Sequence, residues 1–397
     1  MTGRLERPRD IPALILGKGI TALGALRSFG RRSVPVFVLG AQGDLVRRSR
    51  WYRTLPGQAG GDLPDNGLAE ILGALSIPRM VLLPTSDKWA MSASRLPASL
   101  ASRFPSCVPP PEVLERLVDK GRFAATLDEL SVPHPRTLLL DGPESLRPVS
   151  DEQLKGCFLK PTQSGPFAQV YGYKALHFRD RAAAERLLAE AKAKDFSLML
   201  QEYIPGPATQ HHFVEGFLDR TGRACGLFAR RRIRMYPTDF GNSTSTLSIP
   251  MSEVTAASET LLRLLRQIGY HGIFSAEFKL DERDGQFKLL EVNARPWWYV
   301  GFAARSGIDV CDMAYREALG ETVEPVETYR AGRRCIFPRL DLEVGLLEWR
   351  AGRLPLSRLF RSWIGAEQLT LCWDDPQPGL REIFTWSKGR LRRKLGW

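Results

Sequence analysis

The sequence predicts an α/β head built on a parallel sheet, followed by an α+β body and a short C-terminal tail. Three observations predict this class. Between residues 12 and 87, apolar strand-like runs alternate with a helical segment; a proline-rich break, VPPPEV, follows; and adjacent runs of alternating apolar and polar residues come after the break. Alternating strands and helices favour a parallel sheet, whereas adjacent alternating runs joined by turn signals favour antiparallel hairpins.

The head begins with the buried strand PALILGKG, and the helix ITALGALRSFG and the strands VPVFVLG and RMVLLPTSD follow. Gly17, Gly19 and Gly24 resemble a nucleotide-binding turn, but their spacing is not G-x-G-x-x-G, and the second strand ends in Gly40 rather than an acid. We therefore predict that these glycines allow close packing of strand and helix, and an NAD(P)-linked oxidoreductase is disfavoured. Asp87 follows the third strand, at the edge where parallel sheets bind ligands, and is a candidate substrate contact.

The body mixes helices with hairpins. The helix PEVLERLVDKGRFAATLDEL precedes SVPHPRT, and CFLKPTQSGPF supplies a strand with Lys160 at its end and then a Gly/Ser loop. The helix RAAAERLLAEAKAK leads to the strand SLMLQEYIPG, and a hairpin that turns at Thr221 and Gly222 follows. A helix from about Ser252 to Gln267 comes before the last hairpin.

The last hairpin places two carboxylates opposite each other. GIFSAEFKL and FKLLEVNARPWW are joined by DERDGQ, whose Asp-Gly pair is a turn signal. Folding about this turn brings Glu277 opposite Glu291 to within one residue of register, an arrangement that is destabilising unless a cation bridges the two. Glu291, Asn293 and Arg295 share one face, and carboxylate and amide oxygens suit Mg²⁺, whose shell phosphate oxygens complete. The pattern predicts a metal-phosphate site in which Arg295 holds the anion; a solvated edge strand is the alternative.

Composition and charge narrow the class of protein. The chain has 397 residues, a formal net charge of +12 and six scattered cysteines, and this length accommodates two or three domains. No apolar run approaches the ~20 residues of a membrane span, and IPALILGKGI is too short and glycine-broken for a signal peptide. Cysteines without close pairs argue against a zinc site and a disulfide framework, so we expect a protein of the reducing cytoplasm.

The basic charge is concentrated at the C-terminus. Between Arg381 and Trp397 there are six Lys or Arg residues and one Glu, and WSKGRLRRKLGW mixes the bases with Trp and Leu. Such a segment is typical either of a solvated or locally packed helix, which we favour, or of a peripheral contact with the inner face of an anionic membrane. No nucleic-acid-binding motif is present, so nucleic acid is not an expected partner.

Ordered motifs from about Val118 to Gly320 resemble the ATP-grasp superfamily. They are DK with VPHPRT, LKP before a small-residue loop, QEYIPG, AEFK and LLEVNAR, while RIRMYPTDFGNS, EVNARPWW and MAYREALGE are most similar to the carboxylate-amine ligase branch that includes D-aspartate ligases. The resemblance implies a preATP-grasp, Rossmann-like domain over residues 1–108 and an ATP-grasp domain over residues 109–330. The ATP-grasp domain would consist of a small subdomain at about residues 120–200 and a large subdomain at about residues 201–330. A C-terminal extension with the basic tail would occupy residues 331–397.

The resemblance also implies roles for individual residues. ATP is expected between the subdomains, with its phosphates near two lysines and a closing loop and its adenine along a strand: Lys120, Lys160, Ser164, Gly165, Gln201, Glu202, Tyr203 and Ile204. One or two Mg²⁺ ions, with Mn²⁺ as an alternative, are expected on Glu277, Glu291 and Asn293. Arg295 and Arg234 are the implied catalytic residues. By alternation Arg230, Arg232 and Arg234 share a face that suits the triphosphate or an acidic substrate, or is simply solvated.

The implied reaction is ATP-dependent ligation with formation of ADP. A carboxylate attacks the γ-phosphate to give an acyl phosphate, and the amine of an amino acid, peptide or amino sugar then displaces phosphate. An acid-thiol ligase or a small-molecule kinase on the same ATP site is one alternative. A nucleotide-binding scaffold at a membrane or assembly surface is another.

Overall fold

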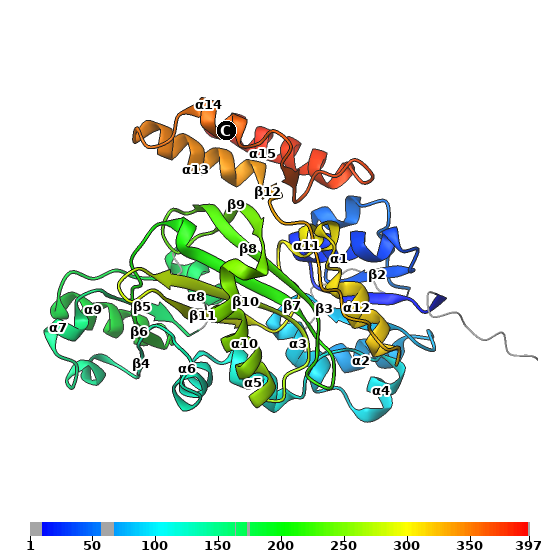
Figure 1. The fold of residues 1–397 in the computed structure, drawn as a ribbon, viewed down its shortest axis with the longest axis horizontal. Helices are drawn as coiled ribbons and strands as arrows, with labels where there is room; N and C mark the ends of the chain where they lie inside the picture. The colour runs from blue at the N-terminus through cyan, green and yellow to red at the C-terminus, as the bar shows by residue number, and fades with distance from the viewer. Residues whose placement is uncertain (1–9, 57–66, 163, 173–174, 396–397) are drawn as a thin grey trace, which may run out of the picture.

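The computed structural model describes residues 10–56, 67–162, 164–172 and 175–395 (Figure 1). In the described part, the strands form three sheets, whose orders are β2-β1-β3, β4-β6-β5 and β11-β10-β7-β8-β9-β12-β13. The first sheet belongs to the head, the second to a small lobe, and the third is the mixed sheet of the body (Figure 1).

The head has the predicted parallel sheet, with β1 between β2 and β3. Its strands are β1 (Ala13–Leu16), β2 (Val36–Leu39) and β3 (Val81–Pro84). Its helical segments are α1 (Gly19–Arg31), η2 (Leu45–Arg48), α2 (Leu68–Ala74), α3 (Asp87–Ser94) and α4 (Ala98–Arg103). All four side chains of β1 and of β3 are buried, as expected for strands covered on both faces.

The glycines of the head serve packing, as predicted. Gly17 has a φ of +133°, and a Cβ atom there would lie 2.2 Å from Oγ1 of Thr85. A Cβ atom on Gly24 would lie 2.9 Å from Cγ1 of Val300, because α1 packs closely against α11 (Val300–Ser306). Both distances are too short for a real Cβ atom. Gly17 therefore permits close packing inside the head, and Gly24 permits close contact between the head and α11 of the body.

Two helices replace the single helix predicted after the proline-rich break. They are α5 (Pro111–Val118) and α6 (Lys120–Glu129). Asp119 separates them, with an extended backbone and a side chain that accepts a hydrogen bond from the amide of Arg122. The prediction of a continuous helix was wrong because an aspartate at this position caps a new helix more favourably than it continues the old one.

The small lobe is built on the antiparallel sheet β4-β6-β5. Its elements are β4 (Thr137–Leu140), η3 (Pro143–Leu146), α7 (Asp151–Leu154), β5 (Cys157–Pro161), α8 (Ser164–Tyr171), α9 (Arg181–Lys192) and β6 (Leu198–Glu202). The strand that ends near Lys160 is confirmed. The Gly/Ser loop after it is not, because Ser164 and Gly165 open helix α8. Pro166 is compatible with this start, since proline is tolerated in the first turn of a helix.

The large sheet carries both predicted hairpins. Its first five strands in chain order are β7 (His211–Leu218), β8 (Ala224–Tyr236), β9 (Asn242–Ile249), β10 (Gly272–Asp281) and β11 (Gln286–Asn293). Short 3-10 turns η4 (Ala208–Gln210) and η5 (Met251–Val254) precede β7 and α10 (Thr255–Gln267). Strands β10 and β11 pair Glu277 with Glu291 and Ser275 with Asn293, and a β-bulge between Glu277 and Phe278 shifts the register set by the turn by one residue to do so.

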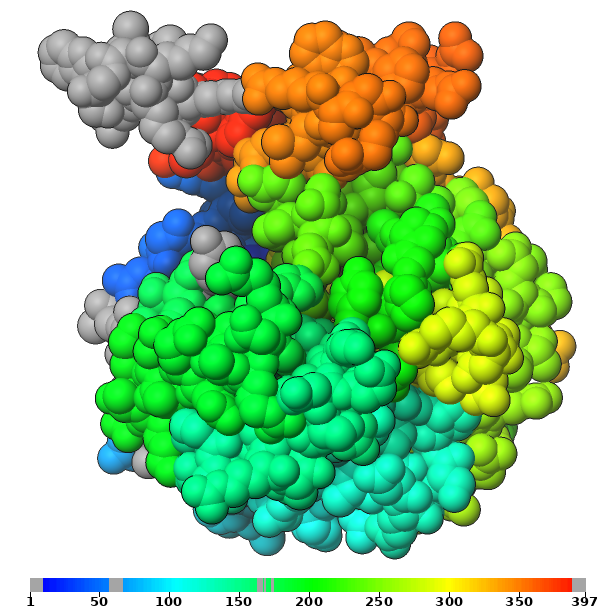
Figure 2. Space-filling view, turned by 90° about the vertical axis from the view of Figure 1, so that its left-hand side faces the viewer, coloured from blue at the N-terminus to red at the C-terminus, as the bar shows by residue number. Residues whose placement is uncertain are grey.

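The segment after residue 330 is more than a tail. It contributes β12 (Arg334–Ile336) and β13 (Glu367–Gln368) to the large sheet. It also forms a layer of helices, which we call the C-terminal layer: α13 (Pro338–Arg350), α14 (Leu356–Arg361) and α15 (Gln377–Leu395). The layer lies along one side of the molecule, above β9 and the head, and α12 (Val310–Ala318) precedes it (Figure 1). Figure 2 shows α13 and α14 standing above the body, with the small lobe in front.

A buried ion pair ties the head to this layer. The Arg27 side chain donates to Asp375 at 2.9 Å and also to the carbonyls of Leu369 and Thr370, and both charged side chains are 1% exposed. Arg27 lies on α1 and Asp375 just before α15, so residues from opposite ends of the chain share one buried contact.

Candidate active site

A cavity of about 110 Å³ lies where the small lobe, helices α5 and α6 and the edge strand β11 meet. The lining includes these residues predicted from the sequence: Lys120, Lys160, Gln201, Glu291, Asn293 and Asp87. They come from α6, β5, β6, β11 and the start of α3, so the fold gathers side chains that are far apart along the chain.

The two lysines lie near the end of β5. Asp119 caps α6, which places Lys120 in its first turn, and Nζ of Lys120 donates to the carbonyl of Pro161 at 2.6 Å. Nζ of Lys160 is 3.5 Å from Oε1 of Gln201, whose amide nitrogen donates to Oγ1 of Thr137 at 3.0 Å. Two ammonium groups therefore reach one cavity from neighbouring elements, which suits an anion with several charges.

The segment from Glu202, the last residue of β6, to Ile204 lies outside this lining. The amide of Glu202 donates to the carbonyl of Arg136 at 2.9 Å, and the amide of Tyr203 donates to the carbonyl of Gly156 at 2.7 Å. Those two donors are already used, and Ile204 is buried. Ser164 and Gly165 form the first turn of α8, and their side chains lie outside the described part of the structure.

An aromatic group connects the small lobe with the body near Tyr203. The rings of Phe158 and Phe240 have centroids 4.5 Å apart, and those of His177 and Tyr203 approach both. Nζ of Lys279 lies 4.9 Å from the centre of the Tyr203 ring. Phe240 belongs to the connection between β8 and β9, so this connection reaches across from the body to the small lobe.

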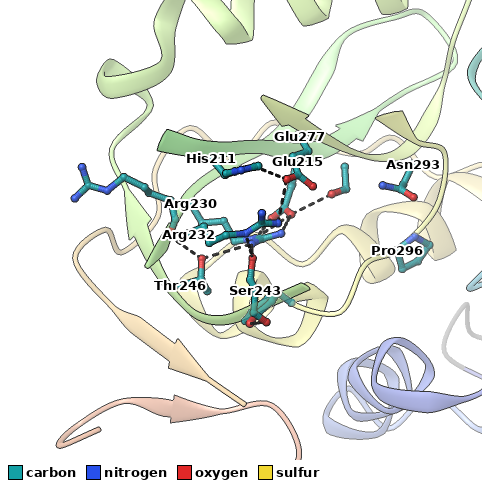
Figure 3. A network of polar contacts seen from close by, with 12 residues as sticks. His211, Glu215, Arg230, Arg232, Ser243, Thr246, Glu277, Asn293 and Pro296 are labelled. Atoms are coloured by element: carbon teal, nitrogen blue, oxygen red, sulfur yellow. Dashed lines mark hydrogen bonds and ion pairs between the residues drawn. The ribbon is translucent and has the colours of Figure 1, made fainter. Parts of the chain in front are cut away.

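The carboxylate of Glu277 is held through one oxygen. Oε1 lies 2.6 Å from Nδ1 of His211 and 3.0 Å from Nη2 of Arg232, while Oε2 has no partner in the described residues (Figure 3). Burial by itself would raise the pKa of Glu277, but Arg232 and His211 outweigh burial and hold this pKa well below its usual value. The side chain therefore stays ionised and keeps one oxygen for a further ligand.

Glu291 and Asn293 lie beside this carboxylate on the edge strand. Glu291 is exposed, and the amide nitrogen of Asn293 donates to its Oε1 at 3.1 Å. The predicted set of two carboxylates and one amide oxygen is thus on neighbouring strands with matching register. In the described part of the chain, no three His, Cys, Asp or Glu side chains converge as a metal site, so the predicted set depends on the Asn oxygen.

Each of three arginines on β8 has its own carboxylate. Arg230 pairs with Glu215 at 2.8 Å, Arg232 with Glu277 at 3.0 Å, and Arg234 with Asp341 at 2.6 Å (Figure 3 shows the first two pairs). The alternative of a solvated face is wrong for Arg230 and Arg232, since each is 4% exposed. These guanidinium groups are matched by buried acids of the fold.

Arg234 contacts the C-terminal layer rather than the cavity. It makes a two-point contact with Asp341 of α13, which also accepts hydrogen bonds from Thr244 and Trp363. Asp341 is completely buried. The cavity lining does not include Arg234, so its predicted catalytic role stays a prediction.

Arg295 joins the body to the head at the rim of the cavity. Its Nε and Nη2 lie 3.0 and 3.3 Å from the two oxygens of Asp87, and Nη2 donates to Oδ1 of Asn293 at 2.8 Å. Asp87 and Arg295 are predicted from separate sequence patterns, and the fold places them in contact.

Two carboxylates that pair with the arginines of β8 were not predicted from the sequence as site residues. Glu215 and Asp341 are completely buried acids, each paired with an arginine. An acid inside the apolar run HHFVEGFL was a usable signal, because a buried carboxylate requires a partner. Nothing in the sequence around Asp341 indicates its pairing.

Comparison with known proteins gives two kinds of likeness. No protein family model matches the chain. Over 240 residues the chain is 22% identical to a D-aspartate ligase of Enterococcus faecium, strain Aus0004, and the match covers 58% of this chain and 57% of that ligase. The chain therefore spans less than two thirds of the length of this curated relative.

Solved structures with low sequence identity share the fold. The biotin carboxylase domain of a Hydrogenobacter thermophilus 2-oxoglutarate carboxylase, in complex with MgADP, ADP and bicarbonate, has a TM-score of 0.62 at 17% identity, covering 82% of this chain and 74% of that one. An L-amino acid ligase of Bacillus licheniformis has a TM-score of 0.58 at 15% identity, covering 82% and 79%. The N5-carboxyaminoimidazole synthetase of Staphylococcus aureus, complexed with ADP, has a TM-score of 0.60 at 13% identity, covering 82% and 81%.

These structural neighbours are ATP-grasp enzymes. The parallel head sheet and the mixed sheet with its helices fit the fold of these neighbours. The likenesses confirm the predicted resemblance: the chain has the ATP-grasp fold, and its curated relative is a D-aspartate ligase.

Proposed function

We propose that this protein is an ATP- and Mg²⁺-dependent ligase that activates a carboxylate as an acyl phosphate and joins it to an amine, with ADP as a product. The observation that carries the proposal is the cavity that gathers Lys120, Lys160, Glu291 and Asn293 between the small lobe and the body. The sequence likeness to a D-aspartate ligase and the fold shared with an L-amino acid ligase support an amino acid as one substrate. A cytoplasmic location, where ATP and Mg²⁺ are available, is part of the proposal.

Lys120 and Lys160 would hold the phosphates of the nucleotide. The cavity of about 110 Å³ is smaller than the ~300–1,000 Å³ of ligand pockets in general. Entry of ATP therefore requires the small lobe to move away from β11. The contacts that must open on this side include the aromatic packing around Phe240 and the hydrogen bond between His177 and Asp239 beside it. They also include the ion pair of Arg283 with Glu202 and the hydrogen bond from Lys120 to Pro161, but no continuous sheet joins the lobe to the body. The Ser164–Gly165 turn would close over the phosphates when the lobe returns.

The adenine is expected along the segment from Gln201 to Ile204. Because the amides of Glu202 and Tyr203 are already bonded, the donor to the base would come from Ile204. The ring of Tyr203 and its aromatic neighbours supply an apolar wall beside this segment.

Glu277, Glu291 and Asn293 would hold the metal. Their oxygens form a donor set that suits Mg²⁺, and the unpartnered Oε2 of Glu277 is oriented by the contacts that Oε1 makes with Arg232 and His211. Bound Mg²⁺ would neutralise charge on the phosphates. His211 is neutral at neutral pH, since burial lowers its pKa, so its N–H donates to the carboxylate without adding a charge.

Arg295 would stabilise the charge that develops as the terminal phosphate moves to the carboxylate substrate. Asp87 and Asn293 hold its guanidinium at the rim of the cavity, so little reorientation is required. We propose a positioning role for Arg234, through Asp341, in addition to its predicted catalytic role. Closure of the lobe would exclude water, which otherwise hydrolyses an acyl phosphate before the amine attacks.

The test is phosphate release from MgATP, screened with pooled amino acids, other small acids and amines. We expect release that depends on a pair of substrates, with ADP and not AMP formed, and a product mass that corresponds to an amide. Glu291→Ala is expected to abolish release, and Glu259→Ala, an exposed carboxylate on α10, to leave it unchanged.

Other outcomes discriminate between the alternatives. A thioester or a phosphorylated product would replace the proposal by an acid-thiol ligase or a kinase. Tight ATP binding without turnover in any pool would favour a nucleotide-binding scaffold. No binding of ATP would overturn the proposed function.

A further inference from the structure

Large apolar side chains are exposed on the C-terminal layer. Most of the exposed large apolar residues in the described part of the chain lie there: Leu347, Trp349, Phe360, Ile364, Trp373, Leu380, Ile383 and Phe384. Ile364 is 81% exposed and Trp373 is fully exposed. Soluble monomers rarely gather so many large apolar side chains on one part of the surface, and such gatherings mark sites of interaction.

Helix α15 shows how this surface is organised. Leu380, Ile383 and Phe384 follow the spacing of one helix face, and all three are exposed. Trp386 lies on a different face of the helix, where its indole N–H donates to Glu343 of α13 at 3.3 Å. The apolar face of α15 is therefore turned away from the protein, although the helix has a second face that packs on α13.

Unpaired basic residues accompany the apolar side chains. Arg350, Arg358 and Arg361 have no ion-pair partner among the described residues. Arg358 and Arg361 flank the exposed ring of Phe360 on α14. This combination of apolar and cationic side chains is typical of segments that lie in the interface of an anionic bilayer.

A basic groove runs beside α15. It has a volume of about 870 Å³ and is lined by four arginines, Arg47, Arg48, Arg339 and Arg381. The two acidic side chains in the lining already have partners. Asp44 accepts a hydrogen bond from the backbone amide of Val46. Glu382 accepts a hydrogen bond from the hydroxyl of Thr370 and lies 3.5 Å from the guanidinium of Arg339. The groove thus has an excess of positive charge and room for phosphate groups.

We propose that the C-terminal layer binds the surface of an anionic phospholipid membrane. Leu380, Ile383 and Phe384 enter the interfacial region, and the arginines of α14 and of the groove contact lipid phosphates. This inference is independent of the proposed reaction. It revises the sequence-based preference for a locally packed tail, since the apolar and basic surface begins well before the final basic residues, whose side chains lie outside the described part.

Charge favours a membrane over a second copy of the chain. Residues 331–397 hold 13 Lys or Arg residues and 7 Asp or Glu residues. A symmetric dimer through this layer would bring the same basic residues of two copies together, which is unfavourable. Anionic headgroups provide the opposite charge for the basic residues and an apolar layer for the exposed side chains.

The experiment is co-sedimentation of the full chain with vesicles of phosphatidylcholine alone, or of phosphatidylcholine with phosphatidylglycerol. We expect binding to the anionic vesicles, weaker binding to the neutral ones, and loss of binding as salt rises. Ile383→Ser combined with Phe384→Ser should weaken binding at least about tenfold, because two apolar side chains no longer enter the interface. Leu138→Ser, an exposed leucine of the small lobe, is the matched control and should bind as the wild type does.

Charge is tested separately. Arg358→Glu and Arg361→Glu should each weaken binding about fivefold or more, whereas Arg186→Glu on α9 should leave it unchanged. All these side chains are on the surface, so circular dichroism and thermal melting should match the wild type.

Four results would overturn the proposal. The first is failure of the wild type to bind anionic vesicles at low salt. The second is binding that the apolar double variant leaves intact. The third is a dimer in sedimentation velocity that the double variant dissociates, which would assign the surface to a second copy. Inorganic phosphate and soluble glycerophosphate serve as competitors: displacement of the protein from vesicles at low concentrations of either would identify a free-phosphate site instead of a membrane surface.

Discussion

Replacing Glu277 with alanine is expected to lower the free energy of unfolding by about 3–5 kcal/mol, whereas replacing its cross-strand neighbour Glu291 should change it by less than ~0.5 kcal/mol. The two carboxylates face each other in the register of β10 and β11 but have different surroundings. The Glu277 side chain is 16% exposed and binds Arg232 and His211 through one oxygen. Glu291 is exposed and accepts one hydrogen bond, from Asn293.

The size of the effect follows from what Glu277→Ala leaves behind. Arg232 is 4% exposed, and without Glu277 its remaining polar contacts are a hydrogen bond to Ser243 at 2.9 Å and a contact with the sulfur of Met235. Neither contact supplies a negative charge. A buried guanidinium without a counter-ion costs several kcal/mol, a large part of the ~5–15 kcal/mol that holds a typical protein folded.

The assay is denaturation by urea, followed by tryptophan fluorescence, in buffer with EDTA so that bound metal does not contribute. Glu277→Ala is compared with wild type and with Glu291→Ala. A third variant combines Glu277→Ala with Arg232→Met, which removes the stranded cation and keeps an apolar side chain in its place. We expect this double variant to recover most of the lost stability.

Two results would refute this reasoning. If the free energy of unfolding of Glu277→Ala were within about 1 kcal/mol of the wild-type value, the polar contacts of Glu277 in Figure 3 would not stabilise the fold. If Glu291→Ala were destabilised as strongly as Glu277→Ala, the difference in burial between the two carboxylates would have no energetic meaning.

Three further perturbations test other parts of the structure. Asp219 has its pKa lowered to about 2, since hydrogen bonds from Thr221 and Arg223 outweigh the raising effect of burial. It therefore contributes stability on the order of 2 kcal/mol that is present above pH ~4 and is lost as pH falls toward 2. Acid titration of unfolding should show Asp219→Asn less stable than wild type at pH 6 and equal to it near pH 2; a constant difference would contradict the assignment. Gly24→Ala should cost about 1–3 kcal/mol in denaturant melts because its Cβ collides with α11, whereas Gly73→Ala, with open space around it, should be neutral or stabilising. Lys160→Met should weaken ATP binding at least about tenfold in calorimetry, and an equal loss in Lys155→Met, an exposed lysine outside the cavity, would show that the effect is not specific.

The hairpin of the candidate site was predictable because its information is local. An Asp-Gly turn between two alternating runs predicts the hairpin and its register to within one residue, and a β-bulge between Glu277 and Phe278 then brings Glu277 opposite Glu291. The parallel head was predictable for the same reason, since each strand is a short apolar run bounded by glycine or proline. The lysines were placed by their motifs, and the fold brings them to one cavity.

The helix break at Asp119 and the start of α8 at Ser164 were harder to predict. At each position the chain can either start a new helix or continue the preceding structure, and the free energies of the two differ by less than about 1–2 kcal/mol. Tertiary contacts can override a difference of this size.

The sequence by itself determined the order of the strands and helices, the hairpin that carries the two carboxylates and the basic character of the last segment, because these depend on the spacing of neighbouring residues. Only the tertiary structure decided which carboxylate neutralises which arginine. Arg234 pairs with Asp341 and Arg27 with Asp375, across separations along the chain that no local pattern encodes. Burial makes such pairs obligatory, since an isolated charge in the interior is too costly, but the choice of partner is made by the packing that brings distant segments together.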